Sequence, residues 1–174
     1  GVNFLLSFLQ TLWAPKGGWN ADSANILKQM VRDFVLSIRT MTEKPIFNDL
    51  RQYIITEVGP QVHSASGYIC DSVHVTKERF DIDGLILAMG DYAEGGAFGF
   101  MLNDPNPRDL FSSRFTVFEV DKLSAINDPK FYSLCILCIM NSFNARMRST
   151  PGMKVMVIEE AWKAISKDGM ADFI

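Results

Sequence analysis

Two adjacent carboxylates, Glu159 and Glu160, are the residues of this sequence best placed to carry chemistry. They directly follow the apolar run 154–158, Lys-Val-Met-Val-Ile, and precede a helix-like Ala-Trp-Lys. Such a run is typical of a buried parallel strand, and ligands bind at the carboxyl ends of parallel strands. One carboxylate there can hold Mg²⁺ through a bound water while the other positions an attacking water, as in P-loop nucleotide hydrolases. The four-apolar-then-two-acidic pattern therefore predicts a nucleotide-hydrolysing site.

The same pair has a simpler interpretation. Acidic residues are common where strands end, and Glu159 and Glu160 would then start a solvated loop or cap the helix that follows. The pattern alone leaves both interpretations open.

Cys135 and Cys138 form a CxxC pair, which raises the question of a redox or zinc site. Redox CxxC pairs lie at helix N-termini, where the helix dipole lowers the pKa of the thiol. Here the pair lies in the middle of an apolar helical run, so we interpret both residues as small hydrophobes without chemistry.

The stretch 61–75 contains both histidines of the chain, His63 and His74, with Cys70 between them. A metal site needs three or four converging ligands at recognisable spacing, and this stretch does not offer that arrangement. Because it also shows little periodicity, we expect it to be the least structured part of the chain.

Composition indicates a globular protein of one ordinary domain in length. The chain has 174 residues, of which 48% are hydrophobic and 21% charged. Its net charge is −3, so composition gives no sign of direct nucleic-acid binding. No apolar run approaches the ~20 residues of a membrane span. Three cysteines, an odd number, favour a reducing compartment over a disulfide framework.

The first part of the chain predicts three helices. Apolar spacing places them over 2–13, over about 22–40, and from an Asn48 N-cap to the Gly59-Pro60 pair. A fourth helix is expected after an Asp81 cap. Phe98, Phe100 and Leu102 then recur at strand period behind Gly95-Gly96, which predicts a short hairpin near 95–104. These glycines lack the GxxxxGK sequence of a phosphate-binding loop, so we expect a turn there and no phosphate cradle.

The last part of the chain has an α/β pattern. The run 115–120, Phe-Thr-Val-Phe-Glu-Val, predicts a buried strand, and Asp128-Pro129 is a strong helix start. We expect that helix to reach about Arg148, to be deeply buried at its centre, and to lead into the strand that ends at Glu159. Strand, helix and strand then form one βαβ unit.

The runs 114–123 and 154–165, with the helix between them, resemble those of the conjugative-transfer ATPases of type IV secretion systems. The similarity is closest to the TraG-type proteins of Bacteroides conjugative elements. Its most specific element is Glu160-Ala161-Trp162-Lys163, which is similar to that family's Asp-Glu-Ala-Trp signature. The likeness is strong from about Leu110, moderate over 81–110, and mostly one of helical pattern before that.

The resemblance implies an α/β fold: a mostly helical insertion followed by a partial RecA-like βαβ core that lacks the Walker A strand. The domains would be 1–110, the insertion with its hairpin, and 111–174, the core. Glu159 would take the position associated with ATP-bound Mg²⁺, acting through water, and Glu160 would be the catalytic, water-activating residue of a Walker B motif. The family usually has Asp where this chain has Glu159, and Mg²⁺ geometry is strict.

The resemblance also implies ATP and Mg²⁺ as cofactors of a longer parent protein, which would work as a homo-oligomer, a hexamer, beside other secretion subunits. That parent would be cytoplasmic and peripheral at the inner membrane. Gly1 without a preceding Met agrees with a segment of a longer chain. Because no GxxxxGK sequence occurs here, we expect this segment neither to hydrolyse ATP nor to bind it tightly, and an unpaired strand edge could make it dimerise.

Two other functions remain open. The helices over 2–55 could form a protein–protein docking module of a secretion apparatus without catalysis of its own. The chain could also be an α/β domain that binds no nucleotide.

Overall fold

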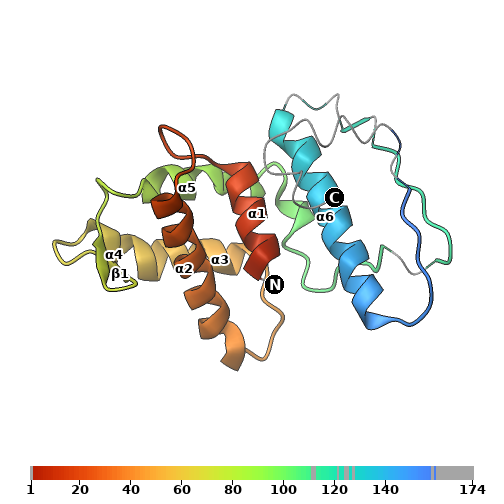
Figure 1. The fold of residues 1–174 in the computed structure, drawn as a ribbon, viewed down its shortest axis with the longest axis horizontal. Helices are drawn as coiled ribbons and strands as arrows, with labels where there is room; N and C mark the ends of the chain where they lie inside the picture. The colour runs from red at the N-terminus through yellow and green to blue at the C-terminus, as the bar shows by residue number, and fades with distance from the viewer. Residues whose placement is uncertain are drawn as a thin grey trace. The chain divides into compact units, whose positions relative to one another are not determined.

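The computed structural model describes residues 2–110, 113–120, 122–123, 126, 128–157 and 159 (Figure 1). Spatial proximity divides the chain into two compact units, Gly1–Pro107 (unit 1) and Arg108–Ile174 (unit 2).

Unit 1 begins with two packed helices, α1 (Val2–Leu12) and α2 (Ala21–Ser37), the second continued by a 3-10 turn over Ile38–Thr40. A capping box starts α2: the side chain of Asn20 accepts from the Ser23 amide at 2.8 Å, and the Ser23 hydroxyl accepts from the Asn20 amide at 3.1 Å. The apolar spacing that predicted α2 corresponds to a buried face along most of the helix, formed by its central apolar side chains: Ile26, Leu27, Met30, Val31 and Phe34.

The third helical segment is longer than predicted. It runs as α3 (Phe47–Tyr53), a π turn (Ile54–Val58) and α4 (Gly59–His63), so the expected stop at Gly59-Pro60 is wrong. Proline lacks an N–H and would clash with a carbonyl in a regular helix. The π turn relieves this conflict, because its wider hydrogen bond joins the Gly59 amide to the Ile54 carbonyl and the chain continues helically.

The start of α3 also differs from the prediction, which made Asn48 its N-cap. The cap residue is Ile46, whose amide donates to the Asp49 carboxylate at 2.8 Å. Asn48 lies inside the first turn, and its amide donates to the side chain of Asn103 at 2.8 Å. The amide of Phe47 donates to the Leu102 carbonyl at 3.1 Å. Leu102 and Asn103, far from α3 in the sequence, therefore accept hydrogen bonds from two backbone amides that a helix start leaves without partners inside the helix.

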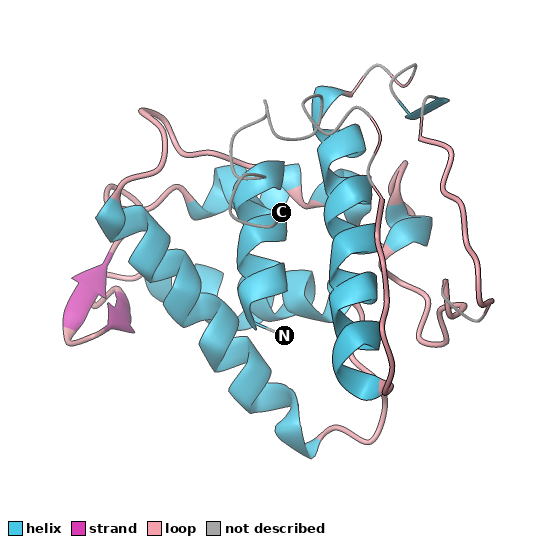
Figure 2. Cartoon of the chain, turned by 45° about the vertical axis from the view of Figure 1, so that its right-hand side comes forward, coloured by secondary structure: helices cyan, strands magenta, loops and turns pink. Residues whose placement is uncertain are grey.

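The stretch expected to be least structured contains the sheet of unit 1. Strands β1 (Tyr68–Cys70) and β2 (Val73–Val75) pair antiparallel, with Ile69 opposite His74 (Figure 2). The connecting residues Asp71 and Ser72 both have positive φ, as a two-residue hairpin turn requires. Strands of three residues are too short to show periodicity, which explains why sequence reasoning missed them.

Helix α5 (Ile82–Ala88) starts as predicted, with the Asp81 carboxylate accepting from the Gly84 amide at 2.9 Å. A 3-10 turn over Gly90–Tyr92 follows it. The ring of the buried Tyr92 lies 5.7 Å from that of Phe8, which contacts Phe47 at 5.4 Å. Aromatic contacts thus join α1, the start of α3 and the 3-10 turn after α5 in one core.

The predicted hairpin near 95–104 is wrong. Residues 93–104 form consecutive tight turns that end in a 3-10 turn over Gly99–Met101. Glycine permits this compaction: a Cβ on Gly96 would lie 2.4 Å from the Gly90 carbonyl oxygen, and one on Gly99 would lie 2.3 Å from that of Ala93. Phe98 and Phe100 recur at the period of a strand but do not share a face as they would in one. Phe98 packs on Tyr92, whereas Phe100 is exposed.

Unit 2 contains one long helix, α6 (Pro129–Ser149), which Asp128 caps as predicted by accepting from the Lys130 amide at 2.8 Å. The expectation of deep burial all round its centre is wrong: Leu134 and Leu137 are buried, but Cys135, Ile136, Cys138 and Ile139 keep intermediate exposure.

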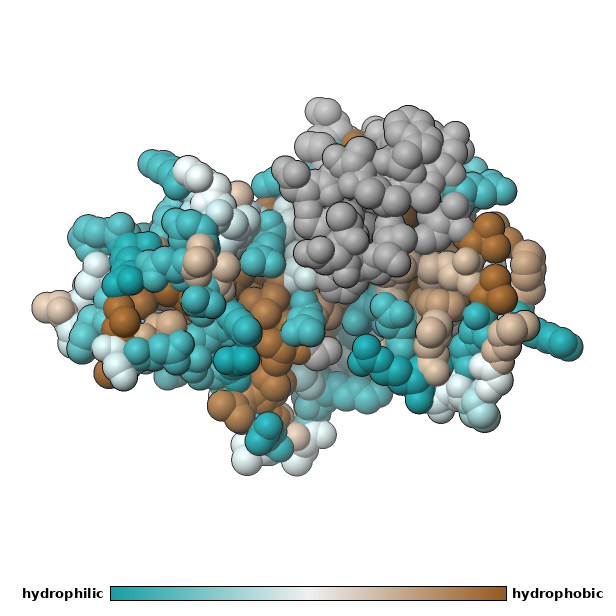
Figure 3. Space-filling view, in the orientation of Figure 1, coloured by the Kyte–Doolittle hydropathy of each residue, from teal (hydrophilic) through white to brown (hydrophobic). Residues whose placement is uncertain are grey.

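The two strands expected beside α6 are not formed among the described residues. Both 115–120 and 153–157 lie outside helices and strands. Even so, exposure alternates along each of them, with Phe115, Val117, Val155 and Val157 between 71% and 83% exposed. Apolar side chains gather on the surface at the right-hand edge of Figure 3, where Figure 1 draws these segments. The segments thus have the exposure period of strands, although no strand ladder includes them among the described residues.

Candidate functional site

The predicted carboxylate pair is only half described. Glu159 lies in a turn directly beyond the extended segment 153–157, is exposed, and makes no hydrogen bond or ion pair with another described residue. Glu160, the predicted catalytic residue, lies outside the described residues. The structure therefore leaves an accessible carboxylate at the end of the segment and shows no assembled nucleotide site around it.

A defined turn connects α6 to this segment. The ammonium group of Lys154 donates to three backbone carbonyls at the helix end, those of Thr150 at 2.6 Å, Gly152 at 3.2 Å and Pro151 at 3.3 Å. Gly152 turns the chain with a φ of +95°. A cation at a helix C-terminus also compensates the helix dipole. Lys154 thus anchors the start of the segment that carries Glu159, a role that its position in the apolar run did not reveal.

The cysteines of α6 are poor nucleophiles. Burial raises the pKa of the Cys135 thiol to about 11, and burial together with the neighbouring Cys135 raises that of Cys138 to about 12. Both are thiols at neutral pH, in agreement with the interpretation of this CxxC as apolar packing.

The histidines do not converge on a metal. The His63 ring lies 3.1 Å from the Asp83 carboxylate, and the His74 ring contacts the Ser66 carbonyl. Within the part of the chain that the structure describes, no three His, Cys, Asp or Glu residues are grouped so that they could hold a metal ion.

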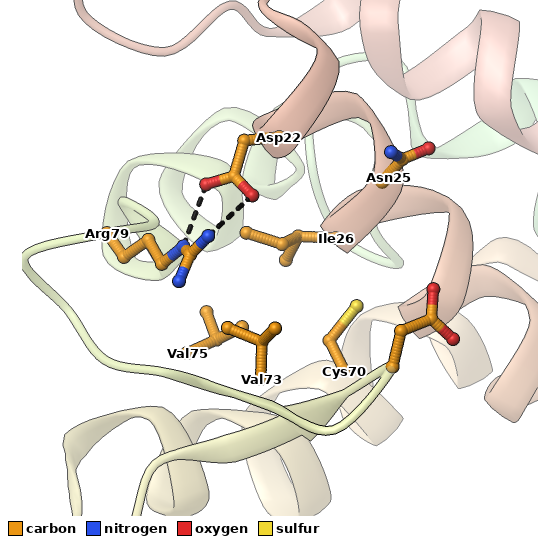
Figure 4. Close-up of a pocket in the computed structure, with 8 residues that line it drawn as sticks. Asp22, Asn25, Ile26, Cys70, Val73, Val75 and Arg79 are labelled. Atoms are coloured by element: carbon orange, nitrogen blue, oxygen red, sulfur yellow. Dashed lines mark hydrogen bonds and ion pairs between the residues drawn. The ribbon is translucent and has the colours of Figure 1, made fainter.

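A small cavity lies between the start of α2 and the hairpin (Figure 4). At its edge the Arg79 guanidinium donates twice to the Asp22 carboxylate, each time at 2.8 Å. These hydrogen bonds hold the pKa of Asp22 below its usual value. With a volume of about 160 Å³ the cavity is smaller than ligand sites generally are. We assign it a structural role: the ion pair joins residues 57 positions apart, which no sequence pattern predicted.

The glycine-rich loop 93–104 is not a phosphate cradle. Gly96 and Gly99 pack against backbone carbonyl oxygens, and the acidic residues Glu94 and Asp104 line the surface groove of the loop. Oxygen-rich walls repel a phosphate. This repulsion argues against phosphate binding, as does the absence of a GxxxxGK sequence from the loop.

The family model described as the TraG P-loop domain matches residues 3–174, almost the whole chain. No curated protein and no solved structure matches. Among the described residues, no helix is both long enough and apolar enough to cross a membrane.

Proposed function

The chain belongs to the TraG P-loop domain family, and we propose that it is a segment of the motor ATPase that powers conjugative DNA transfer through a type IV secretion system. The observation that carries this proposal is the match over residues 3–174. Helices with a small sheet fit the α/β class of that family. The proposal adds a RecA-like core in which 115–120 and 153–157 are strands and α6 is their crossover helix.

The alternating exposure of 115–120 and 153–157 supports this assignment. In each segment the odd-numbered side chains are exposed and the even-numbered ones half-buried, as in a strand. Pairing with neighbouring strands and packing against helices would bury the exposed valines. Parallel strands so placed would bring Glu159 to the carboxyl edge of the sheet, where α/β proteins bind their ligands.

The carboxylates fit the roles that ATP hydrolysis requires. Bound Mg²⁺-ATP supplies the phosphoryl group and the charge that polarises it. Glu159, exposed directly after the extended segment, would accept a hydrogen bond from a metal-bound water. Glu160 would accept a proton from the attacking water and orient that water toward the phosphorus. The side chain of Glu159 is one methylene longer than the usual Asp, so it reaches a metal-bound water more easily than the metal itself.

The proposal extends to the assembly. Hydrolysis would take place in a longer protein that supplies the phosphate-binding loop, works as a homo-oligomer (a hexamer) with other secretion subunits, and lies peripherally at the inner membrane on its cytoplasmic side. The 174-residue chain would not turn over ATP by itself, because it lacks a GxxxxGK sequence. Its unpaired strand edges would favour a dimer.

A second role is compatible with this one. Unit 1 has a core of its own, built from α1 to α5, and does not depend on the nucleotide chemistry of unit 2. It would serve the motor as a docking module for another secretion subunit.

The test is ATP binding and hydrolysis by the full-length protein and its Glu160→Gln variant. We expect nucleotide affinity to persist and kcat to fall by a factor on the order of 10² or more, because a general base contributes about that much. Glu159→Asp, which restores the residue usual in the family, should keep or raise activity, and Glu43→Gln, an exposed carboxylate of unit 1, should change neither quantity. Unchanged turnover in Glu160→Gln would contradict the assignment.

A further inference from the structure

The loop 93–104 contains a second hollow, separate from the cavity beside Arg79. This open groove has a volume of about 390 Å³ and is lined by Glu94, Gly95, Gly96, Gly99, Phe100, Asn103 and Asp104. It lies entirely within unit 1 and has no part in the proposed nucleotide chemistry.

The walls of the groove are held rigidly. Gly96 and Gly99 pack so closely on backbone carbonyls that neither position has room for a Cβ. The side-chain amide of Asn103 donates to the carbonyls of Tyr92 at 2.8 Å and Gly99 at 2.7 Å, while its oxygen accepts from the Asn48 amide at 2.8 Å. One side chain thus ties the loop to itself and to the start of α3. A ligand would find the groove preformed and would not have to order it.

The chemistry of the lining favours a cation. Glu94 and Asp104 are exposed carboxylates, and none of the seven residues that line the groove is basic. One oxygen of Asp104 accepts from the Asn106 amide at 2.8 Å, which orients the carboxylate. Backbone and carboxylate oxygens together make the groove electronegative, so it repels phosphates and nucleic acids.

The same groove exposes an aromatic ring. Phe100 is 74% exposed, although it belongs to a loop whose neighbouring aromatic side chain, Phe98, packs inward on Tyr92. An exposed ring beside carboxylates is the combination that binds a guanidinium, which stacks on the ring face and donates hydrogen bonds to the carboxylates. A small free cation would leave the ring exposed, whereas an arginine carried on a chain would cover it.

We propose that the groove lined by Glu94, Phe100 and Asp104 is a docking site for an arginine side chain on an extended segment of a partner protein. Arginine is favoured over lysine because its planar group can stack on an aromatic ring and donate hydrogen bonds to a carboxylate at the same time. The site is independent of ATP hydrolysis, so its failure would leave the motor proposal untouched.

The experiment is a titration of the ¹⁵N-labelled 174-residue chain with the peptide acetyl-Gly-Arg-Gly-amide at low salt. Two matched peptides carry lysine or neutral citrulline in place of arginine. We expect saturable shifts of the amides of Gly95, Gly96, Gly99 and Phe100, with citrulline binding at least ten-fold more weakly. Phe100→Ala should weaken arginine binding by about three-fold, the size of an exposed cation–π contact. The double variant Glu94→Gln, Asp104→Asn should weaken it by at least ten-fold.

Two controls distinguish this site from general attraction to an acidic protein. Leu87→Ala removes another exposed apolar side chain, 80% exposed, and Glu43→Gln removes another exposed carboxylate, so neither should change the affinity. Shifts spread over acidic surfaces elsewhere, binding that survives the double variant, or equal binding of citrulline would overturn the proposal. Equal binding of the lysine peptide would overturn the choice of arginine.

Discussion

The helices of unit 1 and the two segments 115–120 and 153–157 of unit 2 differ in how far their apolar side chains are buried. In unit 1 the inner faces of the helices bury one another, and residues such as Leu27, Leu50 and Ile54 have no exposed surface. In unit 2 the extended segments leave Phe115 83% and Val157 81% exposed. A helix satisfies its own backbone and needs only a packing partner, whereas a strand needs another strand for its hydrogen bonds. The comparison indicates that unit 1 has a closed core of its own, whereas 115–120 and 153–157, which we propose to be strands, leave apolar side chains exposed.

The largest expected effect tests the completeness of unit 1. Leu27→Ala should destabilise it by about 2–5 kcal/mol, because a cavity opens in a closed core. Val157→Ala should change the stability of the chain by less than about 0.5 kcal/mol, because the side chain is already in water. Urea unfolding in a Trp162→Phe background, followed by the fluorescence of Trp13 and Trp19, reports on unit 1. Equal effects of the two substitutions would remove the contrast between the units.

A smaller effect tests whether the loop 93–104 is as tightly built as the helices. Gly99→Ala should cost about 1–3 kcal/mol, since the new methyl group would lie 2.3 Å from a carbonyl oxygen. Gly90→Ala is the matched control, because nothing lies within 4 Å of its Cβ position and its φ is not positive. It should be neutral or slightly stabilising. The same urea unfolding measures both variants, and a neutral Gly99→Ala would show that the loop yields easily.

These elements also show what the sequence could and could not predict. The caps Asp81 and Asp128, and the spacing within α2, are local signals, and the helices they predicted are present. The hairpin of β1 and β2 was not predicted, because its strands have three residues each. The helix was wrongly expected to end at Pro60, because a π turn allows the chain to continue helically past a proline. The period of two over 98–102 suggested a strand, but the tight turns place Phe98 inward and Phe100 on the surface, so these residues do not share one face. The Asp22–Arg79 pair and the hydrogen bond between the Asn48 amide and the Asn103 side chain join residues that are far apart in the chain. A single sequence carries no local signal for such contacts.

The candidate site likewise has features that the sequence predicted and features that it did not. The family resemblance, carried by the run around Glu160, agrees with the match over residues 3–174. The roles of Glu159 and Glu160 depend on strand pairing, and that pairing is absent from the described residues. The groove at Phe100 was not predicted, although its carboxylates and aromatic residue stand close together in the sequence.

The smallest expected effect is on the stability of the folded chain at acidic pH. The hydrogen bonds from Arg79 lower the pKa of Asp22 in the folded chain, so the pair contributes stability above the unfolded pKa of about 3.9 and loses it as pH falls through the lower folded value. Both side chains are about half exposed, so the contribution is small. A carboxyl NMR titration should place the midpoint of Asp22 below 3.8, and Arg79→Gln should raise it. An unchanged midpoint in that variant would contradict the pairing.

Hydrogen exchange tests most directly whether 115–120 and 153–157 are strand segments of a P-loop core. The amides of both segments should be compared in the 174-residue chain and in the full-length protein, with the buried amides of α2 as an internal reference. We predict rapid exchange in the chain alone, at a concentration at which it is monomeric, and strong protection in the full-length protein, while α2 is protected in both. Rapid exchange of 153–157 in the full-length protein would contradict the account, because the segment before Glu159 would then not be a strand of the core.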